Sequence, residues 1–131
     1  MVGAWYEGKL VGNCKLEEMT DETNRAGFRA GLMSVHPSVM QKGVAKYLIA
    51  AGEEFGRSQG AQFAQMELMM PVSWTNKAYE ALKALPRNQG YREVEVVPYA
   101  EKGERFAKEA HKLKTEVTFT VMRKELQRAK L

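Results

Sequence analysis

The stretch with the clearest chemical meaning runs from Val35 to Leu48 and reads VHPSVMQKGVAKYL. An apolar strand reaches Pro37, which has no N–H for a sheet ladder, and a short polar loop then enters an amphipathic helix at Gly43. The N–H groups of a first helical turn and the positive end of the helix dipole can face a phosphate, and Lys42 adds a charge beside them. The pattern predicts an anion-binding loop. The alternative is an ordinary strand-loop-helix connection with glycine at a tight turn.

This loop differs from two well-known phosphate-binding motifs. Neither the glycine-lysine spacing of the nucleotide P-loop nor the Gly-x-Gly-x-x-Gly of dinucleotide sites is present. The residues instead resemble the coenzyme A pyrophosphate loop of the GCN5-related N-acetyltransferase (GNAT) family, which reads Val-x-Pro, then Gln or Arg, two residues, Gly, one residue, and Gly or Ala. Val35, Pro37, Gly43 and Ala45 match, whereas Met40 stands where Gln or Arg is usual. The resemblance implies a pyrophosphate site formed by Met40, Gln41, Lys42, Gly43, Val44 and Ala45.

The same resemblance implies further cofactor contacts. Met33, Ser34 and Val35 match the strand whose backbone contacts the pantetheine arm of acetyl-CoA, and Asn76 matches a cofactor-facing asparagine. Support comes from Gly90-Tyr91-Arg92-Glu93-Val94, which is similar to the family's Gly-Phe-Arg-x-Val turn. The implied reaction is direct attack of an amine on the acetyl thioester, with acetyl-CoA as co-substrate.

Two residues are candidates for proton transfer. Tyr79 would protonate the departing thiolate if the long segment 83–89 is an insertion after its helix. If Asn76 sets the register, Lys83 takes that place and the role is empty; a half-buried core tyrosine is the structural alternative. Glu67, the only carboxylate in the strand after the loop, could act as a base directly or through water, although we favour a solvent-facing strand position.

The remaining reactive side chains predict no chemistry. We expect His36 and His111 at the surface and Cys14 as a small hydrophobe in a hairpin. One cysteine and two histidines at unrelated spacings predict no metal site.

Composition predicts an ordinary globular protein. The 131 residues are expected to form one domain, residues 1–131, with 44% hydrophobic and 27% charged residues. We find no signal-peptide or membrane-spanning pattern, so the expected location is cytoplasmic. The net charge of +4 favours polyanionic partners, but the charge is spread along the chain.

Hydrophobic periodicity and turn residues predict the elements that position these groups. Helices are expected from Val44, on an apolar stripe of Val44, Leu48, Ala51 and Phe55, and after a Ser73 cap, with Asn76 in the first turn and a stripe of Ala78, Leu82 and Leu85. Pro86 should break the second helix, and a short helix should lie within 101–113. Strands are expected at 2–6, 10–16, 26–35, 61–70, 91–97 and 117–121, with a loop at 20–24 and a solvated basic tail from Arg123.

This order predicts an α/β fold (α+β in some schemes): a mixed, mostly antiparallel central sheet flanked by helices, of the acyl-CoA N-acyltransferase type that the resemblance implies. The family usually has one more strand and two helices before the first strand found here. An exposed edge and apolar face would result, and a homodimer is the expected way to cover them.

Three functions are compatible with the sequence, and they belong to different classes. The first is an N-acetyltransferase that acts on an unidentified amine. The second is a non-catalytic acyl-CoA-binding module. The third, a basic nucleic-acid-binding domain, is disfavoured because the interleaved aromatics of single-strand binders are missing.

Overall fold

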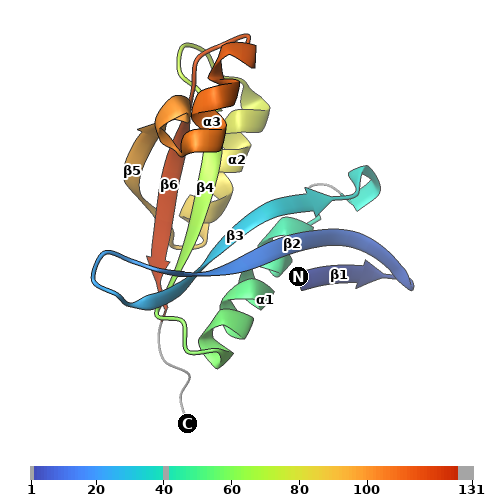
Figure 1. Cartoon of the computed structure of the whole chain (residues 1–131). Coiled ribbons are helices and arrows are strands. Elements are labelled where there is room, and N and C mark those ends of the chain that lie inside the picture. The colour runs from blue at the N-terminus through green and yellow to red at the C-terminus, as the bar shows by residue number, and fades with distance from the viewer. Residues whose placement is uncertain (1, 40–41, 127–131) are drawn as a thin grey trace. The chain divides into compact units, whose positions relative to one another are not determined.

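The computed structural model describes residues 2–39 and 42–126. The chain forms two compact units, residues Met1–Gln65 with Lys124–Leu131 and residues Met66–Arg123, and each is described by itself. The elements, labelled in Figure 1, are β1 (Val2–Tyr6), β2 (Lys9–Thr20), β3 (Ala26–Val35), the 3-10 turn η1 (Pro37–Val39), α1 (Val44–Ser58), β4 (Phe63–Pro71), α2 (Lys77–Asn88), β5 (Arg92–Pro98), η2 (Tyr99–Glu101), α3 (Glu104–Glu109), η3 (Ala110–Lys112) and β6 (Val117–Glu125).

The strands are hydrogen-bonded in the order β1-β2-β3-β4-β6-β5, and the pairs β1–β2, β2–β3 and β5–β6 are antiparallel. The predicted fold class, a mostly antiparallel mixed sheet with helices, is therefore confirmed. Every predicted strand is present, and β3 has the predicted bounds.

The first unit begins with a tight hairpin. Glu7 and Gly8 both have positive φ, at 49° and 75°, which is the geometry of a two-residue type I′ turn. Strand β2 continues to Thr20, which pairs with Ala26, so this strand is longer than the predicted 10–16, and the loop lies at 21–25 instead of 20–24. Asp21 provides the reason, because its side chain closes the turn by accepting hydrogen bonds from residues on its far side.

Helix α1 covers one face of β1, β2 and β3 (Figure 1). The core there is built around Ala4, Cys14 and Leu48, each buried. Cys14 is only 1% exposed, which confirms its expected role as a small hydrophobe.

The buried face of α1 differs from the predicted stripe. Phe55 is 54% exposed, whereas Gly52, Glu53 and Gly56 are buried. A Cβ on Gly56 would lie 2.3 Å from the Phe28 ring, so this glycine lets the helix backbone approach the sheet closely. A prediction based on apolar side chains cannot recognise glycine as a contact residue, and for this reason it placed Phe55 in the buried stripe.

The second unit contains an aromatic cluster. The rings of Tyr99 and Phe106 lie 5.1 Å apart edge to face, and both contact Phe119 on β6 at 5.7 and 5.3 Å. The cluster anchors the short helices between β5 and β6. Helix α3 begins directly after Gly103, within the segment where the sequence predicted a helix.

Helix α2 departs from the prediction at both ends. Asn76, not Ser73, caps it, and Pro86 lies inside it, fully buried. A proline near the end of a helix removes only one late hydrogen bond, and the Pro86 carbonyl accepts from the N–H groups of Gln89 and Tyr91. Leu82, predicted in the buried stripe, is 42% exposed.

The basic C-terminal segment was predicted as a solvated tail, but its first residues belong to β6. Arg123 and Lys124 are half-buried, and Lys124 donates a hydrogen bond to the buried Glu53 at 2.8 Å. Glu53 does not belong to the apolar stripe predicted for α1, yet it is buried. Its burial beneath the helix is stabilised by this ion pair, which the sequence pattern did not reveal.

Candidate functional site

The predicted phosphate loop lies between β3 and α1. Its start is fixed by the His36 N–H, which donates to the Val11 carbonyl on β2 at 2.7 Å. The chain then makes the turn η1, whose Val39 is buried. Met40 and Gln41, two of the predicted pyrophosphate residues, lie outside the described residues.

Gly43 is the N-cap of α1 and has a left-handed backbone, with φ 84° and ψ 8°. Its carbonyl accepts the first helical hydrogen bond, from the Tyr47 N–H at 2.9 Å. The three N–H groups before Tyr47 therefore belong to the first turn, where a helix offers no intrahelical acceptor. Apart from Gly43 and its two chain neighbours, no atom of the residues that the structure describes lies within 4 Å of where a Cβ on Gly43 would be.

The charge around the start of α1 is favourable for an anion. Lys42 is exposed, and Val44 and Ala45 are partly buried. α1 has 15 residues, with no acidic residue in its first turn. The helix dipole is therefore unopposed at its positive end among these residues, as an anion site requires.

His36 is exposed, as expected, and its Nδ1 is engaged within the loop. It lies 2.8 Å from the Ser38 Oγ and accepts the Ser38 N–H at 3.2 Å. The His36 side chain therefore takes part in the hydrogen bonds within the loop. His111 is also exposed.

The predicted pantetheine-contacting stretch forms the end of β3. Ser34 pairs with Asn13, and Val35 with Gly12, both on β2. Met33 belongs to the same strand. These residues lead directly into the loop, so the first unit brings together the strand end and the helix start that the resemblance pairs. Their contact with a cofactor stays a prediction.

Asn76 and Tyr79 lie together at the start of α2 in the second unit. The Asn76 Oδ1 accepts the Tyr79 N–H at 3.0 Å, which is the usual N-cap hydrogen bond. The Tyr79 ring packs edge to face on Trp74, with centroids 5.4 Å apart. The Trp74 Nε1–H donates to the Thr115 Oγ1 at 3.0 Å. Tyr79 is thus half-buried against Trp74, whose position is fixed by its hydrogen bond to Thr115.

The segment 83–89, interpreted from the sequence as a long turn, is mostly helical because α2 continues to Asn88. Lys83 lies one turn after Tyr79, and its Nζ is 3.6 Å from the Glu93 carboxylate on β5. The assignment of the thiolate acid to Tyr79 remains a prediction.

Glu67 does not face solvent, contrary to the favoured interpretation. Its side chain is only 8% exposed and forms an ion pair with Lys102, from the segment between β5 and β6. The Lys102 ammonium also lies 5.5 Å from the centre of the Phe119 ring. Sequence analysis missed Lys102, because no local pattern connects a lysine after η2 with a glutamate 35 positions earlier.

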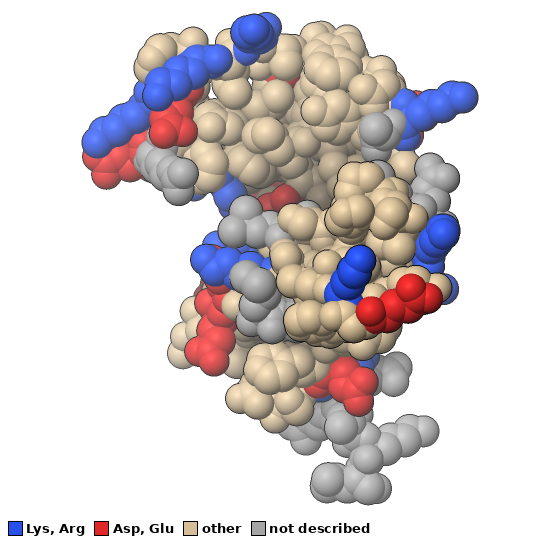
Figure 2. All heavy atoms as spheres, turned by 90° about the vertical axis from the view of Figure 1, so that its right-hand side faces the viewer, with Lys and Arg blue, Asp and Glu red and all other residues tan. Residues whose placement is uncertain are grey.

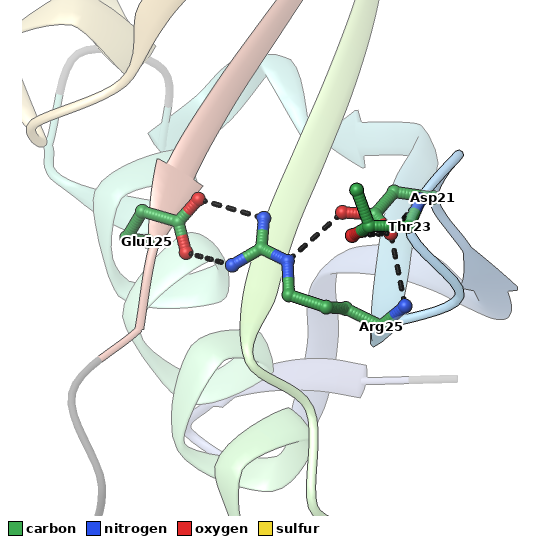
Figure 3. A network of polar contacts seen from close by, with 4 residues as sticks. All are labelled: Asp21, Thr23, Arg25 and Glu125. Atoms are coloured by element: carbon green, nitrogen blue, oxygen red, sulfur yellow. Dashed lines mark hydrogen bonds and ion pairs between the residues drawn. The ribbon is translucent and has the colours of Figure 1, made fainter.

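A second polar cluster that the sequence did not predict lies in the first unit (Figure 3). Arg25 donates two parallel hydrogen bonds to Glu125, at 2.7 and 2.9 Å, and one from Nε to Asp21 at 2.9 Å. Thr23 donates to the same Asp21 carboxylate from its N–H and hydroxyl. In the sequence, this cluster could have been recognised from the Asp-x-Thr-x-Arg spacing, which is typical of a turn that an aspartate side chain closes with hydrogen bonds.

These contacts shift the ionisation of the cluster. Burial alone would raise the pKa of Asp21, but hydrogen bonds from Arg25 and Thr23 together lower it well below its usual value. Hydrogen bonds to Glu125 and Asp21 raise the pKa of Arg25. Elsewhere in this unit, burial raises the pKa of the Cys14 thiol, so that thiol is a poor nucleophile.

Charged side chains of both signs share the surface. On the face drawn in Figure 2, basic and acidic side chains are interspersed. Within residues 2–39 and 42–126, no group of three His, Cys, Asp or Glu side chains is placed to hold a metal ion. None of the helices described is long and apolar enough to cross a membrane.

Comparison with known proteins identifies the fold. No family model matches this sequence, and no curated protein sequence matches it. Many solved structures do match. Among them are the NatC complex bound to Gag peptide and CoA (14% identity, TM-score 0.65), ribosomal-protein-alanine N-acetyltransferase from Brucella melitensis (19%, 0.68) and an acetyltransferase of the GNAT family from Streptococcus pneumoniae (13%, 0.66).

These matches cover 90%, 95% and 95% of this chain. The chain spans 62%, 67% and 65% of the matched structures, respectively. The fold is therefore that of the GNAT acetyltransferases, as the motif resemblance implied.

Proposed function

We propose that this protein is an N-acetyltransferase that transfers the acetyl group of acetyl-CoA to an amine. One observation supports the proposal: the end of β3, the left-handed Gly43 and the first turn of α1 follow one another in a geometry that suits an anion, within a fold shared with acetyltransferases.

In the proposed reaction the amine nitrogen attacks the thioester carbonyl carbon directly. The carbon–sulfur bond breaks, the amine loses a proton, and the coenzyme A thiolate gains one. Backbone groups of Met33, Ser34 and Val35 hold the pantetheine arm, and the loop from Lys42 to Ala45 holds the pyrophosphate. Holding the two reactants in position supplies most of the rate acceleration that such a direct transfer needs.

Two side chains are assigned proton-transfer roles within this proposal. Tyr79 donates the proton to the thiolate, and we expect Tyr79→Phe to lower kcat with little change in the affinity for acetyl-CoA. Water takes the amine proton in place of Glu67, because Lys102 already engages that carboxylate. Glu67→Gln should therefore change the pH dependence of kcat/KM little.

The alternative is a module that binds acyl-CoA without catalysis. The engagement of Glu67 by Lys102 favours it, because the side chain considered as a catalytic base already has a structural role. A panel of small amines and peptide N-termini, assayed for release of the coenzyme A thiol, separates the two functions.

The binding experiment uses Gly43, where the structure offers a matched pair of variants. Asparagine tolerates the left-handed backbone, and aspartate has the same shape with a negative charge. We expect calorimetric titration to show micromolar binding of acetyl-CoA to the parent and to Gly43→Asn, and loss of binding in Gly43→Asp. Gly60, with φ 88° at the other end of α1, provides the control Gly60→Asp, which should bind normally.

Two results would contradict the proposal. Equal binding by the two Gly43 variants would show that no anion lies at this loop. If the folded parent does not bind acetyl-CoA at millimolar concentration, the protein shares the acetyltransferase fold but the proposed function is wrong.

A further inference from the structure

A hollow of about 530 Å³ lies in the first unit, between the C-terminal end of α1 and the ends of β2 and β3 that meet at the β2–β3 turn (Figure 1). Its volume is in the range of small-molecule binding sites. Phe28 lines it from β3, and Phe55, Gly56 and Gln59 line it from the end of the helix. Gly43 lies at the other end of this helix of 15 residues, about 22 Å long, so the hollow is separate from the predicted phosphate loop.

Hydrogen bonds fix both walls of this hollow. At the end of α1, the N–H groups of Gln59 and Ala61 donate to the carbonyls of Phe55 and Gly56 at 3.2 and 2.9 Å. On the other side, the pairing of β2 with β3 continues as far as Thr20. The hollow is therefore formed before any ligand binds, and binding costs little conformational entropy.

An exposed aromatic side chain borders the hollow. Phe55 is 54% exposed, although the sequence predicted it in a buried stripe, whereas the Phe28 ring is only 5% exposed. Together the two rings present apolar surface to a ligand, which gains free energy by leaving water. The face of an aromatic ring also attracts a cation. Phe55 therefore suits a ligand that is both apolar and positively charged.

The charge of the hollow is also favourable for a cation. Among the described residues that line it, the charged ones are Glu17 and Glu18, in a chain whose net charge is +4. Glu17 already pairs with Lys15 at 2.8 Å. Glu18 is exposed and pairs with Phe28 in the β2–β3 register, so it lies on the same face of the sheet as that ring. It forms no ion pair with the residues that the structure describes, so its carboxylate is available to a ligand.

We propose that this hollow binds a small organic cation, an ammonium group carried on an apolar, aromatic body. The ammonium interacts with the Glu18 carboxylate and the Phe55 ring, and the negative end of the α1 dipole, at Gln59, favours the same charge. The body of the ligand packs against Phe28 and Leu16. The inference does not depend on the proposed function, because neither the phosphate loop nor acetyl-CoA takes part in it.

The test is a titration followed by two-dimensional ¹H–¹⁵N NMR, with three probes that share a phenyl ring and differ in charge. They are 2-phenylethylamine, a cation at neutral pH, the neutral 2-phenylethanol, and the anion phenylacetate. We expect the amine to bind with a Kd of roughly a millimolar, as is usual for a ligand of this size, and to shift the amide signals of Glu18, Phe55 and Gln59. The alcohol should bind roughly fivefold more weakly, because it lacks the ion pair and the cation–π contact, and the anion should cause no shifts.

Matched variants assign the two contacts. Glu18→Gln should weaken the amine roughly twofold to fivefold and leave the alcohol unchanged, because only the amine is charged. Its control is Glu54→Gln, since Glu54 is exposed on α1 but does not line the hollow. Phe55→Ala should weaken both probes several-fold. Its control is Tyr47→Ala, because Tyr47 lies on the same helix with a similar exposure, 58%, outside the hollow. Circular dichroism confirms that each variant is folded.

Each outcome decides the proposal. Selective binding of the amine, weakened by Glu18→Gln and not by Glu54→Gln, would support it. Equal binding of the three probes, or equal weakening by the two glutamate variants, would show that the hollow has no specific cation site. If the amine shifts no signals of the lining residues in the folded parent, the proposal is wrong, whatever the result with acetyl-CoA.

Discussion

The glycines of α1 permit a sharp test of how the helix packs on the sheet. Gly52 and Gly56 lie one turn apart on its buried face. Alanine at either position should gain up to about 1 kcal/mol from helix propensity. The net effect on stability then depends on which atoms the new methyl group contacts.

At Gly56 the methyl group would lie 2.3 and 2.4 Å from two carbons of the Phe28 ring, which is buried. Contacts between carbon atoms are optimal at about 3.5–4.0 Å, so the overlap exceeds about 1 Å. Overpacking of a core costs about 1–3 kcal/mol. Because an overlap above about 1 Å belongs to the upper part of this range, about 2–3 kcal/mol, and helix propensity offsets about 1 kcal/mol, we expect Gly56→Ala to lower the free energy of unfolding by about 1–2 kcal/mol net.

At Gly52 the methyl group would lie 3.3 Å from the Leu16 Cδ2, the mobile end of a side chain. A shift of a few tenths of an ångström relieves this contact, so Gly52→Ala should be neutral or stabilising by up to about 1 kcal/mol. The two variants differ in the sign of the effect although the substitution is the same.

Urea denaturation monitored by far-UV circular dichroism measures both changes, and thermal unfolding should show Gly56→Ala melting roughly 3–8 °C below the parent. A double variant, Gly56→Ala with Phe28→Leu, removes the ring that the methyl group meets. It should recover part of the loss as a non-additive coupling. If Gly56→Ala is as stable as Gly52→Ala, the close approach of α1 to β3 is wrong.

Three further predictions concern the ion pairs and the sheet edge. Glu53→Gln removes the buried carboxylate that pairs with the half-buried Lys124 ammonium, so we expect the free energy of unfolding to fall by roughly 2 kcal/mol or more. Replacing both Glu53 and Lys124 by Met should restore the stability. Urea denaturation measures both effects. The lowered pKa of Asp21 means that its hydrogen bonds with Arg25 stabilise the fold fully above the unfolded pKa, about 4, and progressively less as pH falls toward the folded value. Asp21→Asn should thus be less stable than the parent at pH 7, with a difference that narrows at pH 2.5; a constant difference would refute this role. We expect a homodimer formed through the β1 edge, where Leu10 on the neighbouring strand is 47% exposed, so Leu10→Lys should shift sedimentation equilibrium toward monomer. A monomeric parent at 100 µM, about a hundred times a micromolar Kd, would exclude this dimer.

Local patterns predicted the elements well where one residue dictates one conformation. Pro37 stops β3, and Gly43 starts α1 in a left-handed conformation that other residues adopt at a cost. Alternation of apolar residues located β3 at its observed bounds. The backbone of the loop between β3 and α1 was therefore predictable, whereas its binding of an anion stays a prediction.

Predictions failed where a contact joins distant parts of the chain within a unit. Lys102 engages Glu67, and Lys124 engages Glu53, although no spacing in the sequence suggests either pair. The burial of a carboxylate depends on whether a cation arrives from another element, and this is a property of the packed structure.

The sequence by itself determined the order of strands and helices, the position of the loop between β3 and α1 and the resemblance to the acetyltransferase fold, because these depend on backbone preferences and hydrophobic periodicity over short spans. Only the tertiary structure decided which face of α1 is buried and that Asn76 serves as a helix cap. It also decided that Phe28 and Phe55 line one hollow with Glu18. Those features depend on which surfaces meet across long sequence separations, and side-chain type alone does not specify that.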